Sequence, residues 1–162
     1  MPRKAFSPPL QQDNDEQAKT KVCLIGSGNW ASAIATIVGE NCLSLPFCQD
    51  QVNMWTHEEQ VKLCANDGHN DNDNKDGSTN KSETTALTRI INERHENVKY
   101  LPGIQLPDNV VAVSDLAEAC QGANLLIFVL PHQFLPELLP EIRKHVDPQH
   151  CRGVSLVKGL GM

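Results

Sequence analysis

The chain has 162 residues, enough for one α/β domain but not for two large ones. Its net charge is −6 and no basic patch stands out, which argues against a nucleic-acid partner. No apolar run approaches the length of a membrane span, so we expect no membrane partner. The six cysteines are scattered and lack the spacing of zinc ligands, which is typical of reduced thiols in a cytoplasmic protein. We therefore expect a soluble protein of the cytoplasm without a bound metal.

The first part of the chain combines a polar tail with a glycine motif. Residues 1–20 are polar and contain three prolines, which predicts a disordered tail. The apolar run of residues 22–25, which the charged Lys21 precedes, then predicts a buried parallel strand. The next six residues spell G-x-G-x-x-A and lead into a helix that we expect to end at Gly39. These six residues are Gly26, Ser27, Gly28, Asn29, Trp30 and Ala31.

The glycine motif has the residue types that a dinucleotide site needs. Gly26 permits a sharp turn, Gly28 leaves room for a pyrophosphate, and the small Ala31 lets the helix pack closely on the strand. The free N–H groups and the positive end of the helix dipole then face the phosphates. The alternative is a glycine-rich turn between strand and helix in some other α/β protein.

A second strand is predicted over residues 51–55, and four polar residues, Thr56 to Glu59, follow it. In a dinucleotide-binding fold this strand end meets the adenosine ribose, where a carboxylate binds the 2′-hydroxyl and repels a 2′-phosphate. Glu58 or Glu59 in this role favours NAD over NADP. The alternative places both in the first turn of a helix, where the dipole favours acidic residues. His57 either stacks on adenine or is an inert surface residue.

The middle of the chain contains a polar insertion. Residues 65–84 have almost no apolar side chains, so we expect a disordered insertion within a domain that spans residues 21–162. An EF-hand-like spacing inside it lacks the flanking helices of a calcium site. Helical periodicity returns over residues 85–95. In the connection that follows, Lys99 and Tyr100 face either a phosphorylated ligand or solvent.

The last third of the chain repeats the strand–helix pattern. Residues 109–113 predict a third strand, and Ser114 is expected to cap a helix over residues 115–120. The most hydrophobic strand, residues 124–131, is expected beside the first strand, as the doubly wound order requires. His132, Gln133 and Phe134 follow at its carboxyl end, where ligand contacts are common.

Three features complete this region. Phe134 either shields the nicotinamide of a dinucleotide or packs in the core beneath a helix over residues 134–145. That helix should be kinked or broken at Pro140. A fifth strand is predicted over residues 153–157, and Lys158 follows it. Its ammonium group would either pair with a phosphate or polarise a carbonyl in the crevice, or be solvated.

Together these units predict an α/β fold: a Rossmann-type, doubly wound, mostly parallel sheet with helices on both faces. Five stretches also resemble the cytosolic, eukaryotic-type NAD-dependent glycerol-3-phosphate dehydrogenases. The resemblance extends from Lys21 to Gly159, interrupted by the polar insertion. The stretches that carry it are residues 26–35, 52–55, 95–103, 126–134 and 155–159.

The resemblance implies an activity, namely hydride transfer between NADH and dihydroxyacetone phosphate to give glycerol 3-phosphate, and the reverse. It implies that residues 26–31 hold the pyrophosphate, that Phe134 contacts the cofactor and that Lys158 contacts the substrate. His57 stands where family members often have a phenylalanine near the adenosine, and Ala31 replaces the usual third glycine. Full-length members are expected to be homodimers.

The resemblance also implies a second, helical domain with the catalytic lysine, which residues 1–162 do not include. We therefore expect no catalytic residue here and a chain that is the cofactor-binding portion of the enzyme, inactive alone because hydride transfer needs both reactants held together. The alternative is a non-catalytic NAD-binding module or a truncated pseudoenzyme.

Overall fold

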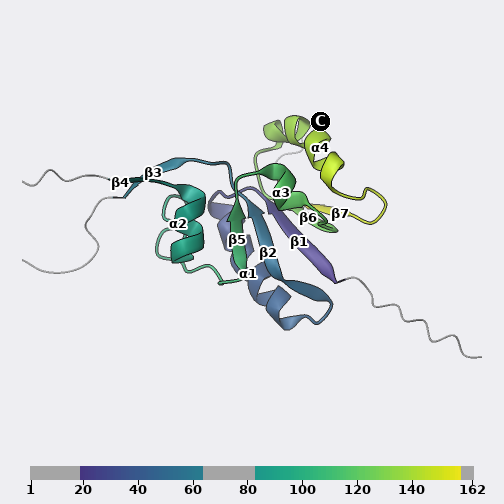
Figure 1. The fold of residues 1–162 in the computed structure, drawn as a ribbon, viewed down its shortest axis with the longest axis horizontal. Helices are drawn as coiled ribbons and strands as arrows, with labels where there is room; N and C mark the ends of the chain where they lie inside the picture. Colours follow the sequence, from purple (N-terminus) through teal and green to yellow (C-terminus); the bar gives the residue numbers. More distant parts are fainter. Residues whose placement is uncertain (1–18, 64–82, 158–162) are drawn as a thin grey trace, which may run out of the picture.

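The computed structural model describes residues 19–63 and 83–157. Within these ranges a five-stranded sheet, parallel throughout, has the order β5-β2-β1-β6-β7 (Figure 1). Its strands are β1 (Thr20–Ile25), β2 (Cys48–Trp55), β5 (Val110–Val113), β6 (Leu125–Phe128) and β7 (Arg152–Ser155). The strand order reverses between β1 and β6, as in doubly wound folds. The predicted fold class is confirmed, and so is the place of the most hydrophobic strand beside the first.

Helices cover both faces of this sheet. Alternate residues of β1 point to opposite sides, so Val22 and Leu24 enter one core cluster and Cys23 and Ile25 enter the other. The helices α1 (Asn29–Ser44) and α2 (Leu87–Arg94) pack on the first cluster. On the second cluster pack α3 (Leu116–Cys120) and α4 (Leu135–His145). Burial on both faces explains why β1 is a continuous apolar run rather than an alternating one.

The predicted end of α1 at Gly39 is wrong, since the helix continues to Ser44. Gly39 is needed for close packing instead. A Cβ atom at this position would lie 2.9 Å from Cγ2 of Val110 and 3.1 Å from Cγ of Pro107. The absence of a side chain therefore lets α1 approach the edge of β5, a contact between residues far apart in the sequence.

Two other local predictions are also corrected. Asp115, not Ser114, caps α3, because its carboxylate accepts a hydrogen bond of 2.7 Å from the backbone N–H of Glu118. The helix α4 continues through Pro140 to His145, so the predicted break there is wrong, whereas the alternative of a kink stays a prediction. Its apolar side, including the buried Ile142, packs on the second core cluster, and this tertiary packing compensates for one missing backbone hydrogen bond.

A small antiparallel hairpin, absent from the sequence-based expectation, lies outside the main sheet. It pairs β3 (Gln60–Leu63) with β4 (Glu83–Ala86). The helix expected from residue 85 therefore starts at Leu87, and the last two residues of the expected insertion belong to β4. β-branched Thr84 and Thr85 favour the strand. Glu58 and Glu59 precede β3, so their placement in a helical first turn is wrong.

The cap of α3 gives a direct test of this correction. Replacing Asp115 with alanine removes the acceptor for the Glu118 N–H, and we expect the free energy of unfolding to fall by about 1 kcal/mol. Ser114→Ala is the matched control, because no hydrogen bond of its hydroxyl contributes to the cap, and it should change stability by less than about 0.5 kcal/mol. Urea unfolding followed by circular dichroism measures both, and equal losses would contradict the assignment.

Candidate functional site

Two adjoining cavities open at the carboxyl ends of the parallel strands, where the strand order reverses. The β7-side cavity, about 720 Å³, is bounded by the start of α1, the end of β6 and residues 156–157. The β2-side cavity, about 610 Å³, is bounded by the end of β2, the connection after α2 and the start of α4. Both are lined by Gly28 and by residues 129–131. The glycine loop, residues 26–31, thus separates them.

Gly26 begins the glycine loop in a backbone conformation that disfavours a side chain. Its φ is +122°, and an added Cβ atom would lie 2.5 Å from the carbonyl oxygen of Val129. Its N–H donates to the carbonyl of Trp55 over 3.1 Å. The ends of β1, β2 and β6 therefore meet around a residue that has no room for a side chain.

Gly28 and the first turn of α1 form the open part of this loop. Gly28 precedes the helix without any side-chain cap, and no atom lies within 4 Å of an added Cβ position. The N–H of Ser32 donates to the carbonyl of Gly28, so the N–H groups of residues 29–31 precede this hydrogen bond of the first turn. Such N–H groups, together with the helix dipole, favour an anionic group. Ala31 is fully buried against the sheet, whereas Asn29 and Trp30 are exposed.

The glycine loop is held from beneath by a residue that our sequence analysis missed. Asn97 is fully buried, and its Nδ2 donates to the carbonyl of Ser27 over 2.8 Å and to Oγ of Ser32 over 2.9 Å. The Ser32 hydroxyl in turn donates to the carbonyl of Gly28 over 3.1 Å. The sequence places Asn97 in one of the stretches that carry the family resemblance, but nothing local links it to a residue 70 positions earlier.

The β2-side cavity collects several of the predicted residues. His57 lies on its lining, as do Trp55 and Tyr100. Phe134 also lines this cavity and is 45% exposed, so the alternative that it packs in the core is wrong. It follows His132 and Gln133 in a short 3-10 turn, η1 (His132–Phe134), that leads into α4. Aromatic and imidazole side chains therefore surround a cavity at the end of β2.

The two candidate carboxylates at the end of β2 differ in their surroundings. Glu58 accepts a hydrogen bond of 2.5 Å from the Thr88 hydroxyl and does not line the cavity. Glu59 lines it, and its carboxylate accepts a 2.5 Å hydrogen bond from the Tyr100 hydroxyl and pairs with Lys99. The ammonium group of Lys99 also lies 5.0 Å from the centre of the Tyr100 ring. Lys99 and Tyr100 are thus both held by Glu59. This contact was part of neither predicted alternative, a phosphorylated ligand or solvent.

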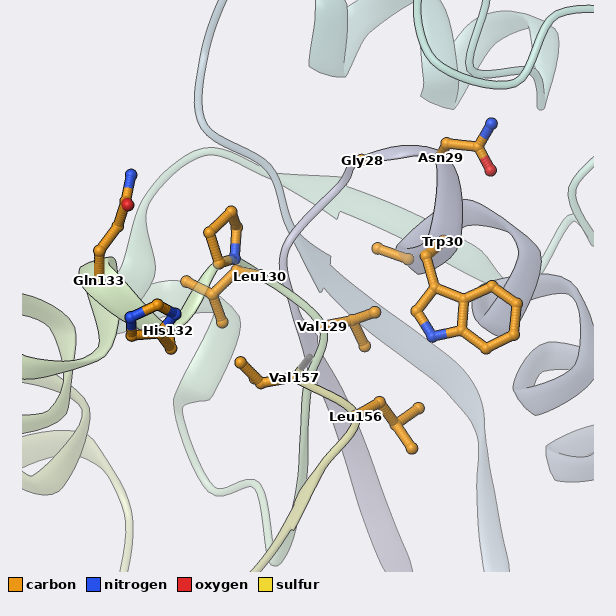
Figure 2. Close-up of a pocket in the computed structure, with 11 residues that line it drawn as sticks. Gly28, Asn29, Trp30, Val129, Leu130, His132, Gln133, Leu156 and Val157 are labelled. Atoms are coloured by element: carbon orange, nitrogen blue, oxygen red, sulfur yellow. The ribbon is translucent and has the colours of Figure 1, made fainter. Parts of the chain in front are cut away.

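The β7-side cavity is mostly apolar with a polar edge. Figure 2 shows Trp30 and Leu156 on one side of it and His132 and Gln133 on the other. Val129 and Val157 lie between them. A largely apolar pocket with a few polar groups is the usual form of a small-molecule site. Lys158, the next residue along, lies outside the described residues.

Thiol and metal chemistry have no support in the part of the chain that the structure describes. Its cysteines are free thiols, and none of them lines either cavity. Burial raises the pKa of Cys42 to about 11, so this thiol stays protonated at neutral pH. No cluster of metal-binding side chains occurs among residues 19–63 and 83–157, and the EF-hand-like spacing lies outside them. None of the helices there has the length and apolar character to span a membrane.

The two glycines of the loop should respond differently to substitution. Gly26→Ala forces a Cβ against the Val129 carbonyl and strains a positive φ, so we expect a loss of about 2–5 kcal/mol in the free energy of unfolding. Gly28→Ala is the matched control, because its φ is −68° and the space around it is open. It should change stability by less than about 1 kcal/mol in either direction, because the lower entropy of the unfolded chain offsets the weaker N-cap that alanine provides. Chemical denaturation of both variants measures this, and similar losses would refute the geometry.

The comparisons with known proteins agree with this geometry. The family model described as NAD-dependent glycerol-3-phosphate dehydrogenase N-terminus matches residues 21–162. Over 141 residues the chain is 45% identical to glycerol-3-phosphate dehydrogenase [NAD(+)] of Candida tropicalis, covering 86% of this chain and 30% of that protein. Over 142 residues it is 45% identical to the cytoplasmic glycerol-3-phosphate dehydrogenase [NAD(+)] of Drosophila virilis, covering 88% and 34%.

A solved structure of glycerol-3-phosphate dehydrogenase from Saccharomyces cerevisiae superposes with a TM-score of 0.69 at 42% identity. The match covers 87% of this chain and 34% of that one. The chain thus spans about a third of the length of the relatives that it matches.

Proposed function

The chain belongs to the NAD-dependent glycerol-3-phosphate dehydrogenase family, matching its N-terminal part, and from this premise we propose that it binds NAD(H) for the interconversion of dihydroxyacetone phosphate and glycerol 3-phosphate. The observation that carries the proposal is the open start of α1 between two cavities. One phosphate-binding loop flanked by two pockets matches the shape of a dinucleotide, which has a pyrophosphate between two nucleosides.

Each part of the site then has a role. Residues 26–31 hold the pyrophosphate through backbone N–H groups, and the space beside Gly28 accommodates it. The β2-side cavity receives the adenosine, with His57 and Phe134 at its lining. In this proposal Phe134 contacts the adenosine side of the cofactor and does not shield the nicotinamide, because it is not among the residues that line the β7-side cavity. The β7-side cavity receives the nicotinamide, and its apolar lining from Val129, Leu156 and Val157 contacts the reactive ring. Bound NADH supplies the hydride.

The substrate end of the reaction rests on the resemblance to the family. We assign substrate contact to Lys158, because it follows directly on Val157, which lines the β7-side cavity. In the relatives about two thirds of the length lies outside the matched part, and we assign the catalytic lysine to that remainder. Binding without turnover is therefore our expectation for residues 1–162 alone. The cytoplasmic location and a homodimeric full-length protein belong to the same proposal.

The two tryptophans of the chain make the proposal measurable, because Trp30 lines the β7-side cavity and Trp55 the β2-side cavity. NADH should quench the fluorescence of both single-tryptophan variants, Trp55→Phe and Trp30→Phe, with the same dissociation constant. The comparison of the two cavities uses NAD⁺, which does not absorb where tryptophan emits and therefore quenches by contact. ADP-ribose lacks the nicotinamide, so it should leave Trp30 at least several-fold less quenched than NAD⁺ does while affecting Trp55 equally. A folded chain without saturable quenching by NADH would refute the proposal.

The preference for NADH over NADPH should depend on Glu59. Its carboxylate repels a 2′-phosphate and occupies the ammonium group of Lys99. Glu59→Gln removes the repulsion and releases Lys99, so the affinity for NADPH should rise about tenfold relative to NADH, as expected for roughly 1.4 kcal/mol of charge interaction. Titration of both cofactors measures the ratio.

The matched control for this ratio is Glu58→Gln, because Glu58 faces Thr88 rather than the cavity. This variant should keep the NADH-to-NADPH ratio of the unmodified chain. A ratio that shifts equally in both variants would exclude a specific role of Glu59.

A further inference from the structure

We propose that Asn97 is a positioning residue for the pyrophosphate: its buried amide turns the glycine loop so that the N–H groups of Gly28 and Asn29 face the ligand. The inference rests on the proposed function, which assigns residues 26–31 to the pyrophosphate. Asn97 itself is not among the residues that line either cavity.

The argument starts from the hydrogen bonds of the Asn97 side chain. Both hydrogens of its Nδ2 are used, one on the carbonyl of Ser27 and one on Oγ of Ser32. Its Oδ1 accepts from the backbone N–H of Tyr100 over 3.2 Å. Asn97 has no exposed surface, so water does not replace any of these hydrogen-bond partners. The amide therefore holds the loop in one geometry.

The planar trans peptide converts this contact into an orientation. In such a unit the C=O and the following N–H point in opposite directions. Because the Ser27 carbonyl is held towards the buried Asn97, the N–H of Gly28 points away from it. The Gly28 carbonyl accepts from the N–H and the hydroxyl of Ser32, so the N–H of Asn29 likewise points away from the helix. Both N–H groups are therefore directed to the open side of the loop before any ligand arrives.

The segment that carries Asn97 is itself fixed at both ends. His95 follows α2 as its C-cap with a φ of +50°, and its carbonyl accepts a hydrogen bond of 2.6 Å from the N–H of Leu106. Within this closed segment the Glu96 carboxylate accepts from the N–H of Gly103 over 2.7 Å. Tyr100 extends from the same segment to Glu59 at the β2-side cavity. A rigid support of this kind is what a preorganised anion site needs.

A merely structural asparagine is available for comparison. Asn92 on α2 donates to the carbonyl of Ala112 over 2.9 Å and accepts from its N–H over 2.7 Å, which anchors the helix to β5. The residue is exposed, but its two hydrogen bonds are partly buried and of the same kinds as those of Asn97, and it lines neither cavity. Replacing either asparagine with alanine removes buried hydrogen bonds, so both variants lose stability.

The test compares Asn97→Ala with Asn92→Ala in the full chain. We expect the affinity for NADH, measured by Trp30 quenching, to fall roughly tenfold or more in Asn97→Ala. It should change less than about twofold in Asn92→Ala, although both unfold at lower urea concentrations. Equal NADH affinities of the two variants would overturn the positioning role.

A second measurement needs no ligand and separates this inference from the proposed function. Nuclear magnetic resonance order parameters of the Gly28 and Asn29 amides should fall in Asn97→Ala, and the Ser32 amide should exchange with solvent faster, whereas Asn92→Ala should change neither. If the unmodified chain fails to bind NADH, the proposed function fails, and these amides still decide whether Asn97 orders the loop. Unchanged amides would refute the inference even if NADH binds.

Ser32→Ala keeps the test decisive if Asn97→Ala does not fold. It removes the hydroxyl between Asn97 and the Gly28 carbonyl and leaves the amide contact to Ser27 intact. We expect an intermediate loss of NADH affinity, about threefold, with lower order parameters at Asn29 but not at Gly28. If neither the NADH affinity nor the order parameter of Asn29 changes, the role of the Ser32 hydroxyl between Asn97 and the Gly28 carbonyl is contradicted.

Discussion

The close approach of Gly26 to the Val129 carbonyl is the constraint on which the site depends. With 2.5 Å between that oxygen and an added Cβ, the end of β1 and the end of β6 meet at a distance that excludes any side chain. The chain must turn there with a positive φ, and the turn delivers the start of α1 to the point where the strand order reverses. The two cavities exist because this loop stands between them rather than filling the crevice.

A second support of the glycine loop comes from a segment much later in the sequence. The segment between α2 and β5 is closed by the hydrogen bond between His95 and Leu106, and it supplies Asn97 to the loop and Tyr100 to the β2-side cavity. The glycine loop and the β2-side cavity therefore share one scaffold. A displacement of this segment would alter both together, which makes it a structural link between them.

The sequence predicted those parts of the fold that depend on local pattern. The apolar run of residues 22–25 in β1 and the apolar β6 identified two central strands, and the spacing of Gly26, Gly28 and Ala31 identified the turn between strand and helix. Their order in the sheet followed from the general doubly wound topology. These signals are contained within a few neighbouring residues, so one sequence is sufficient to read them.

The features that were mispredicted depend on contacts between distant segments. Gly39 marks the close packing of α1 on β5, not a helix end, and the Thr-rich β4 forms a strand only because β3 pairs with it. Ser114 and Asp115 are both good caps by type, and only the backbone geometry selects Asp115. Asn97 is the extreme case, since its partners Ser27 and Ser32 lie 70 and 65 residues away. No periodicity or spacing encodes such a pairing.

The two cavities differ in the polarity and rigidity of the side chains that line them. The β2-side cavity has a wall of paired polar groups, in which Glu59 is bonded to both Lys99 and Tyr100 and has little freedom to rearrange. The β7-side cavity is bounded by Leu156 and Val157, both only half-buried, next to β7, whose residues are exposed. A preorganised wall favours affinity, because little conformational entropy is lost when the ligand arrives. An apolar, open-sided cavity suits a flat ring but leaves it accessible to water, so under the proposed function the described residues alone do not shield the nicotinamide from water.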